Sequence, residues 1–241
     1  MNHGALERHN AAQQRYFERR VPGTMVPRAT PYVRRHVDQL LYGSGIGEGA
    51  SVLEVGCGMG NYTFELARRG LALEGLDLSP VLLERLRAYA AEELDIPLHC
   101  ADVLAPPDGL RSRFDGVIGF FTLHHLHDLE ASIASMATLL RPGGRLAFVE
   151  PNAFNPLYYV QIAATPGMSF RGERRLTSMR PSVIFPALRR AGLSDAQVHR
   201  YGFFPPQVAN RTAGRALERT LEQLRPLRRI SAFQLFISRR P

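Results

Sequence analysis

The stretch from Ser51 to Gly60 constrains this chain more than any other part of its sequence. A short apolar run over residues 52–55 indicates a buried strand. It breaks directly into glycines at alternate positions, Gly56, Gly58 and Gly60, and an amphipathic helix pattern follows. A strand that turns sharply through glycines into a helix brings the backbone close to a ligand and aims helix N–H groups at it. The stretch therefore predicts a ligand site at the end of a strand.

The spacing of the glycines narrows the kind of ligand. Folds that bind dinucleotides use G-x-G-x-x-G, whereas here the third glycine comes one residue early and Asn61 follows it. Asp77 ends the next apolar run, where a carboxylate suits the two hydroxyls of a ribose. Glu54, two residues before the first glycine, adds a carboxylate that can hold an ammonium group, directly or through water. The glycine spacing therefore disfavours a nicotinamide cofactor more than any other ligand considered.

The order Val-Leu-Glu-Val-Gly-Cys-Gly-Met-Gly over 52–60 resembles motif I of the class I S-adenosylmethionine-dependent methyltransferases. The resemblance implies S-adenosyl-L-methionine as cofactor. It also implies that Asp102 accepts from the adenine amino group while the amide of Val103 donates to a ring nitrogen. The cofactor-binding residues expected on this basis are Tyr16, Glu54, Gly56, Cys57, Gly58, Gly60, Asp77, Leu78, Asp102, Val103 and Phe120.

Short apolar runs alternate with helical patterns from residue 51 onward, which is typical of a parallel, doubly wound sheet. We expect strands over 51–55, 71–77, 96–100, 114–119, 145–150, 194–201 and 230–238. A hairpin between the last two strands makes the final strand antiparallel. The predicted fold is α/β, a doubly wound Rossmann-like, seven-stranded mixed sheet with an N-terminal helical cap.

The predicted domain organisation has two parts. Residues 1–45, with helices over 5–20 and 31–43, form the cap, in which Tyr16 could close over the cofactor sulfonium or simply pack in the core. Residues 46–241 form the methyltransferase domain. Two insertions, 151–180 and 202–230, are expected to cover the substrate. The first supplies an apolar wall from Tyr158, Tyr159, Ile162, Met168 and Phe170.

The run after the fourth strand, Phe-Phe-Thr-Leu-His-His-Leu-His-Asp, resembles the His-His-Leu-x-Asp signature of small-molecule methyltransferases of type 11. The resemblance places this run beside the methyl acceptor. Histidine titrates near neutrality, so we expect His125, and second to it His124, as the base for a hydroxyl, thiol or acidic carbon, with a structural role as the alternative. Glu150, at the end of the fifth strand, is expected to orient the acceptor. We expect no metal, because the histidines of so short a loop do not easily converge.

Charge is unevenly distributed along the 241 residues, which contain no lysine and carry a net charge of +8. Residues 171–241 hold 15 arginines against four acids, a net of +11. This third of the chain could face anionic lipid, an anionic substrate or nucleic acid, or form a solvated surface. The N-terminus lacks the apolar core of an export signal, and the two cysteines suggest no disulfide framework. We expect a cytoplasmic protein, with peripheral contact to an anionic membrane as a further expectation.

The sequence therefore predicts a methyltransferase that acts on a small, apolar or lipid-like acceptor. The alternatives are an RNA or protein methyltransferase and a non-catalytic, cofactor-binding partner subunit of the same fold. The absence of Asn/Asp-Pro-Pro-Tyr/Phe after the fourth strand disfavours exocyclic amino groups of bases. No recognisable RNA-binding appendage is present, so we expect no nucleic-acid partner.

Overall fold

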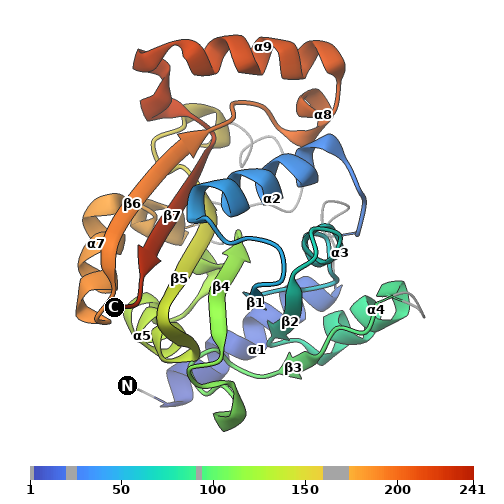
Figure 1. Cartoon of the computed structure of the whole chain (residues 1–241), viewed down its shortest axis with the longest axis vertical. Coiled ribbons are helices and arrows are strands. Elements are labelled where there is room, and N and C mark those ends of the chain that lie inside the picture. The colour runs from blue at the N-terminus through green and yellow to red at the C-terminus, as the bar shows by residue number, and fades with distance from the viewer. Residues whose placement is uncertain (1–2, 20–25, 91–93, 160–173) are drawn as a thin grey trace.

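We describe the protein from a computed structural model, which covers residues 3–19, 26–90, 94–159 and 174–241. Its centre is one seven-stranded sheet with the order β3-β2-β1-β4-β5-β7-β6 (Figure 1). The strands are β1 (Ser51–Val55), β2 (Ala72–Asp77), β3 (Leu98–Cys100), β4 (Phe114–Phe120), β5 (Leu140–Pro151), β6 (Ser194–Tyr201) and β7 (Phe233–Arg239). β7 pairs antiparallel with both β5 and β6, and the other neighbours pair in parallel. The predicted mixed sheet is confirmed.

Helices precede the sheet and connect its strands. They are α1 (His3–Arg19), α2 (Pro31–Ser44), α3 (Thr63–Ala67), α4 (Pro80–Ala90), α5 (Leu129–Leu139), α7 (Pro181–Arg190), α8 (Pro206–Ala209) and α9 (Thr212–Gln223). Short 3₁₀ helices are η1 (Asp108–Leu110), η2 (Leu123–His125), η3 (Arg174–Ser178) and η4 (Arg225–Ile230).

The sequence after Pro205-Pro206 predicts one helix over about 207–224, but the structure has two helices there, α8 and α9. A side chain at Gly214 would place its Cβ 2.1 Å from the carbonyl oxygen of Val208, so only glycine lets α9 pack this closely on α8. The chain turns between them at Arg211, whose backbone is extended.

The two faces of the sheet are covered by different helices. Phe148 of β5 and Phe236 of β7 share a buried cluster with residues of α5 and α7. Their neighbours Ala147 and Leu235 belong to a second buried cluster with α2 and α3. Successive residues of a strand point to opposite faces, so β5 and β7 supply both halves of the core from adjacent positions.

Local sequence explains how α2 is placed over the sheet. The side chain of Thr30 accepts a hydrogen bond from the amide of Val33 at 3.2 Å, and Pro31 occupies the first turn. Gly45 ends the helix with a left-handed backbone (φ +67°), a conformation that glycine adopts without strain. These two caps fix where α2 begins and ends, and its buried residues Val37 and Leu40 pack against the sheet.

We expect Phe236→Ala to lower the free energy of unfolding by about 3–5 kcal/mol, because it empties a position that is fully buried in the core. Tyr42→Ala is the matched control: Tyr42 is 91% exposed, so its loss should change stability by less than about 0.5 kcal/mol. Urea denaturation followed by circular dichroism measures both. Equal effects of the two substitutions would contradict this account of the core.

Candidate active site

A cavity of about 1220 Å³ runs along the carboxyl ends of the central strands. One end is lined by the turns that follow β1, β2 and β3, including Gly58, Asp77 and Asp102. The other end is lined mainly by aromatic side chains from α2, β7 and the segment before α8. Ligands bind at the carboxyl ends of such sheets, and a single-ligand pocket typically encloses about 300–1,000 Å³. This cavity therefore has room for two molecules side by side.

The glycine turn after β1 closes around the carboxylate of Asp77. The amide of Gly58 donates to Asp77 Oδ2 at 2.8 Å, and the amide of Ser79 donates to Oδ1 at 2.9 Å. Gly56 has φ +73°, and a Cβ there would lie 2.5 Å from Thr122 Oγ1. Burial raises the pKa of Asp77, while these backbone hydrogen bonds oppose the rise. Asp77 is thus held rigidly at the cavity wall.

Helix α1 lies across the site and bonds to it through three polar side chains. Asn10 Nδ2 donates to Asp102 Oδ2 at 2.5 Å, and Gln14 Nε2 donates to the carbonyl of Leu78 at 2.8 Å. His9 Nε2 contacts the carbonyl oxygen of His125 at 2.9 Å. Asn10 and Gln14 are four residues apart, which puts both on one face of the helix. α1 therefore closes the cavity over the ends of β2 and β3.

Glu54 lies behind the glycine turn and is not among the residues that line the cavity. Its Oε2 accepts a hydrogen bond from Thr63 Oγ1 at 2.6 Å, which ties β1 to the start of α3. Burial raises the pKa of Glu54 to about 8, the Thr63 bond lowers it, and the charge of Asp77 raises it further. In this structure the Glu54 carboxylate bonds to Thr63 and does not line the cavity.

Glu150, fully buried at the end of β5, holds the loop after β4. Its Oε1 accepts from the amides of Thr122 at 2.8 Å and Leu123 at 2.7 Å. Its Oε2 lies 2.6 Å from His124 Nδ1. Because Oε1 is already an acceptor of two N–H groups, we assign the proton of this last bond to His124 Nδ1. Glu150 does not line the cavity, and the contacts described here are with the loop after β4.

His124 and His125 both line the cavity, and their ring centroids are 3.9 Å apart. Burial lowers the pKa of His125 well below its usual range, and the neighbouring His124 and His9 lower it further. His125 is therefore a neutral imidazole at pH 7. The ring of His124 is held by the carboxylate of Glu150.

The far end of the cavity is aromatic. Tyr62 stacks on Phe120 with centroids 4.2 Å apart, and Phe121 and Phe233 meet edge to face at 5.8 Å. Further aromatic residues that line this end are Tyr32, Tyr158, Phe203 and Phe204. Offset and edge-on ring contacts of this kind favour a flat, apolar guest.

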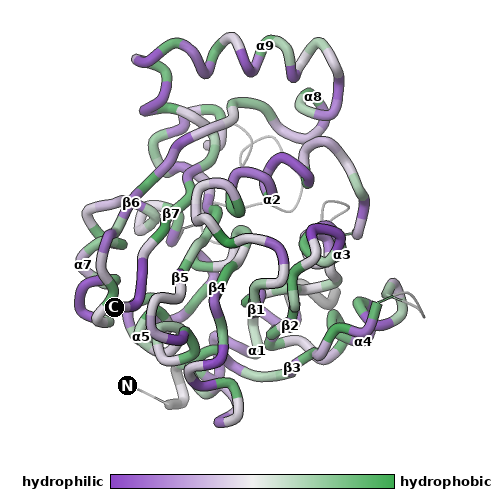
Figure 2. The backbone as a smooth tube through the Cα atoms, viewed as in Figure 1, coloured by the Kyte–Doolittle hydropathy of each residue, from purple (hydrophilic) through white to green (hydrophobic). Residues whose placement is uncertain are grey.

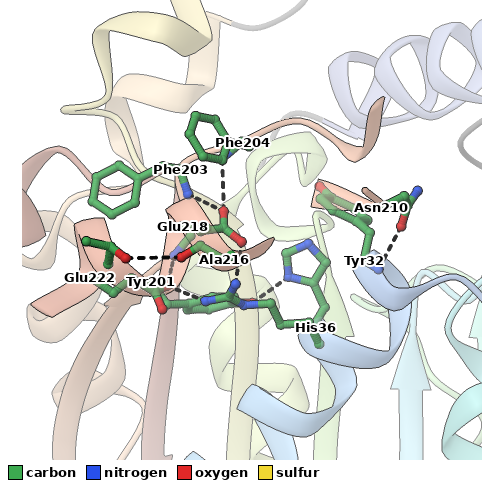
Figure 3. A network of polar contacts seen from close by, with 12 residues as sticks. Tyr32, His36, Tyr201, Phe203, Phe204, Asn210, Ala216, Glu218 and Glu222 are labelled. Carbon is green, nitrogen blue, oxygen red and sulfur yellow. Dashed lines mark hydrogen bonds and ion pairs between the residues drawn. The ribbon is translucent and has the colours of Figure 1, made fainter. Parts of the chain in front are cut away.

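A buried polar network supports the aromatic end (Figure 3). His36 Nδ1 lies 2.5 Å from the hydroxyl of Tyr201, and burial lowers the pKa of His36 to about 3. Glu218 of α9 accepts from the amides of Phe203 at 2.6 Å and Phe204 at 3.0 Å and pairs with Arg35 of α2. These bonds fix the two phenylalanines against the cavity.

The expected cofactor residues fall into three groups. Those that line the cavity are Gly56, Cys57, Gly58, Asp77, Leu78, Asp102, Val103 and Phe120. Glu54 and Gly60 lie behind the turn; a Cβ at Gly60 would meet Phe64 at 2.7 Å. The side chain of Tyr16 lies outside the described residues, although its backbone belongs to α1.

Of the residues expected to form an apolar wall, two are described by the structure, and one of them lines the cavity. Tyr158 lines the cavity, whereas Tyr159 turns its hydroxyl to the carbonyl of Ala153 at 2.8 Å. Ile162, Met168 and Phe170 lie outside the described residues.

Residues that the sequence reading missed come from α1 and from the segment before α8. Polar residues at 9, 10 and 14 could have signalled a helix face with hydrogen-bonding partners. The run Phe203-Phe204-Pro205-Pro206 could have signalled an aromatic wall in an extended segment. Within the described ranges, no group of three or more His, Cys, Asp or Glu side chains is arranged to hold a metal ion.

Residues 52–144, from β1 into β5, match a family model described as a methyltransferase domain. The matched residues hold β1 to β4 and the start of β5, and with them the glycine turn and the loop after β4. The chain is 34% identical over 114 residues to a ubiquinone biosynthesis O-methyltransferase of Alkalilimnicola ehrlichii, covering 47% of this chain and 46% of that protein.

Two further known proteins are similar to this chain. A demethylmenaquinone methyltransferase of Tropheryma whipplei is 32% identical over 119 residues, which are 48% of each chain. The chain thus spans about half the length of the curated relatives it matches. A solved structure from Thermotoga maritima, described as a SAM-dependent methyltransferase and possible histamine N-methyltransferase, has a TM-score of 0.61 at 14% identity and covers 98% of both chains. That likeness concerns the fold.

We expect Glu54→Gln to change how stability depends on pH. The folded-state pKa of about 8 lies above the ordinary value of 4.5, so folding favours the protonated carboxyl. The contribution of Glu54 to stability is therefore complete below pH 4.5 and is lost as the pH rises towards 8. The stability of the variant relative to the natural chain should rise across this window by up to about 1.4 kcal/mol per pH unit.

Urea titrations at several pH values within that window measure this difference. Glu84→Gln on α4 is the control, because Glu84 is exposed and its replacement should give a difference that does not vary with pH. A constant difference for Glu54→Gln as well would show that Glu54 is not a buried, protonated carboxyl.

Proposed function

We propose that this protein transfers the methyl group of S-adenosyl-L-methionine to a small, apolar, quinone-like acceptor. The observation that carries the proposal is the single cavity that joins two chemically different ends. One end offers the carboxylates of Asp77 and Asp102, and the other offers aromatic walls. A histidine held by Glu150 stands on the loop between them.

The cofactor end fits S-adenosylmethionine in its donor and acceptor groups. Asp77 accepts backbone hydrogen bonds from Gly58, Ser79 and Leu78, and a carboxylate has about four lone-pair sites, so one site is left for a ribose hydroxyl. Asp102 and the amide of Val103 would hold the adenine, and Gly56 and Gly58 would let the backbone approach the remainder of the cofactor. When bound, the cofactor supplies a methyl group that its sulfonium already activates for in-line displacement.

The protein's part in the reaction is to align the acceptor and to remove a proton where the acceptor is a hydroxyl. His124 is the better candidate for this base, because Glu150 holds its Nδ1 proton and fixes its ring, as a carboxylate does in other carboxylate–histidine pairs. His125, neutral and beside it, is the second candidate. Proton removal raises the rate only when the acceptor atom is already aligned with the methyl group.

The acceptor class follows from the aromatic end and from the relatives. Tyr62, Phe120, Phe121 and Phe233 would enclose a ring, and offset or edge-on contacts stabilise such a guest. Two curated relatives are named for O-methylation in ubiquinone biosynthesis and for methylation of demethylmenaquinone. Both names support an acceptor of quinone-like, lipophilic character.

We expect Asp77→Asn to weaken the binding of S-adenosylhomocysteine by about tenfold to a hundredfold, since hydrogen bonds to a charged group contribute about 1.5–3 kcal/mol each. Isothermal titration calorimetry measures the affinity, and a thermal melt confirms that the variant is folded. Asp108→Asn is the control, because the side chain of Asp108 is fully exposed on η1. An unchanged affinity in a folded Asp77→Asn variant would place the cofactor site elsewhere.

The reaction itself is tested with cofactor that carries a labelled methyl group, incubated with the protein and a quinol with a free ring hydroxyl. We expect label in the organic phase. Both His124→Gln and His125→Gln are assayed separately, and the larger loss of turnover, at least about a hundredfold for a positioned base, should fall on His124→Gln. The exposed His199→Gln on β6 is the control.

Label that appears only in a macromolecular pellet when cell extract replaces the quinol would overturn the small-molecule acceptor. A larger loss for His125→Gln than for His124→Gln would instead reverse the roles of the two histidines.

A further inference from the structure

Helix α9 turns its acidic side towards the rest of the protein. Glu218 is 1% exposed and bonds to the amides of Phe203 and Phe204 and to Arg35. One turn further on, Glu222 accepts from the amide of Gly202 at 2.6 Å and also pairs with Arg35. The acidic face of this helix is therefore turned inward.

The apolar side of α9 consequently faces solvent. Leu217 is 52% exposed and Leu224, just past the helix end, is 49% exposed. Leu217 precedes Glu218 and so lies about 100° from it around the helix, while Ala213 and Leu221 lie four residues away on the same side as Leu217. The tube of α9 alternates between hydrophobic and hydrophilic colours as it crosses one end of the molecule (Figure 2). Surface helices ordinarily show the reverse orientation.

Arginines surround this apolar stripe. Five of them are exposed on α9, at its start and on η4: Arg211, Arg219, Arg225, Arg228 and Arg229. In the described part of the chain, none of these five guanidinium groups is paired with a carboxylate within 4.0 Å. Neighbouring Arg200 of β6 has its pKa lowered by burial first and by the charge of Arg229 second, which reflects crowded positive charge.

We propose that this face, which we call the α9 surface (residues 211–230), binds the surface of an anionic lipid bilayer. Exposed leucines between arginines match both layers of such a surface, since the leucines enter the acyl boundary and the arginines meet the anionic headgroups. A second copy of this chain is a poorer match, because it would bring two sets of unpaired arginines together.

The α9 surface is connected to the cavity through α8, so membrane binding there would bring the cavity close to the bilayer. α8 lines the cavity through Pro206 and Gln207 and packs directly on α9 at Gly214. Among the helices that the structure describes, none combines the length and apolar character needed to cross a bilayer. This part of the inference rests on the proposed function: a lipophilic acceptor would pass from the bilayer into the cavity beside α8.

The test is flotation of the full-length protein with vesicles of phosphatidylcholine alone or mixed equally with phosphatidylglycerol. We expect binding to the mixed vesicles only, weakened by salt. Leu217→Gln/Leu224→Gln should reduce the partition coefficient at least tenfold. Arg225→Gln/Arg228→Gln should reduce it by roughly fivefold for each arginine removed.

The control variants change similar residues elsewhere on the surface. Tyr89→Gln on α4 replaces a side chain of similar exposure to Leu217, and Arg111→Gln replaces an exposed arginine next to η1. Both should bind vesicles as the natural chain does. A thermal melt of each variant shows whether it is folded, and glutamine is well tolerated in helices.

Absence of binding to the mixed vesicles, or equal binding by the α9 variants and the controls, would overturn the proposal. So would dimerisation that depends on Leu217 and Leu224 without vesicle binding, since the occupant would then be a second copy. Titration with S-adenosylhomocysteine separates the two proposals. Intact cofactor binding without vesicle binding overturns only the α9 surface, and the opposite result overturns only the proposed function.

Discussion

The buried carboxylate of Glu150 fixes the loop that carries the histidines lining the cavity. It stands at the end of β5, between β4 and β7 in the sheet, and accepts the amides of Thr122 and Leu123 together with the contact to His124. Burying a carboxylate is costly unless its lone pairs are used, so this loop must adopt one conformation for the strand to be buried at all. The position of His124 is therefore fixed, through Glu150, by a central strand of the sheet.

Much of the fold and one end of the site were predictable from local sequence. β1 and β6 have the expected bounds, because apolar or alternating runs are enclosed by glycines and turns. Asp77 and Asp102 could be placed together because the carboxyl ends of neighbouring parallel strands meet at one edge. The amphipathic pattern after β1 predicts a helix over 60–69, whereas the helix in the structure runs only from Thr63 to Ala67, after the left-handed Gly60.

The rest depends on pairs that no local pattern connects. Arg35 and Glu218 are separated by 183 residues, and Asn10 and Asp102 by 92. Periodicity identifies α9 as amphipathic but does not say which face is buried. The acidic face is buried because the turn at 202–204 leaves backbone N–H groups that need acceptors, and Glu218 and Glu222 supply them. Likewise, the roles of Glu54 and Glu150 as supports for their turns follow only from three-dimensional contacts.

The contacts of α1 couple the entry and exit of small molecules to the movement of a whole helix. Asn10, Gln14 and His9 bond to Asp102, to Leu78 and to the loop of His125, which are the groups that face the cavity. We expect a molecule the size of a nucleoside to leave that end only after these bonds break. On the proposed function, the undocking of α1 would then set how long the spent cofactor stays bound in each cycle.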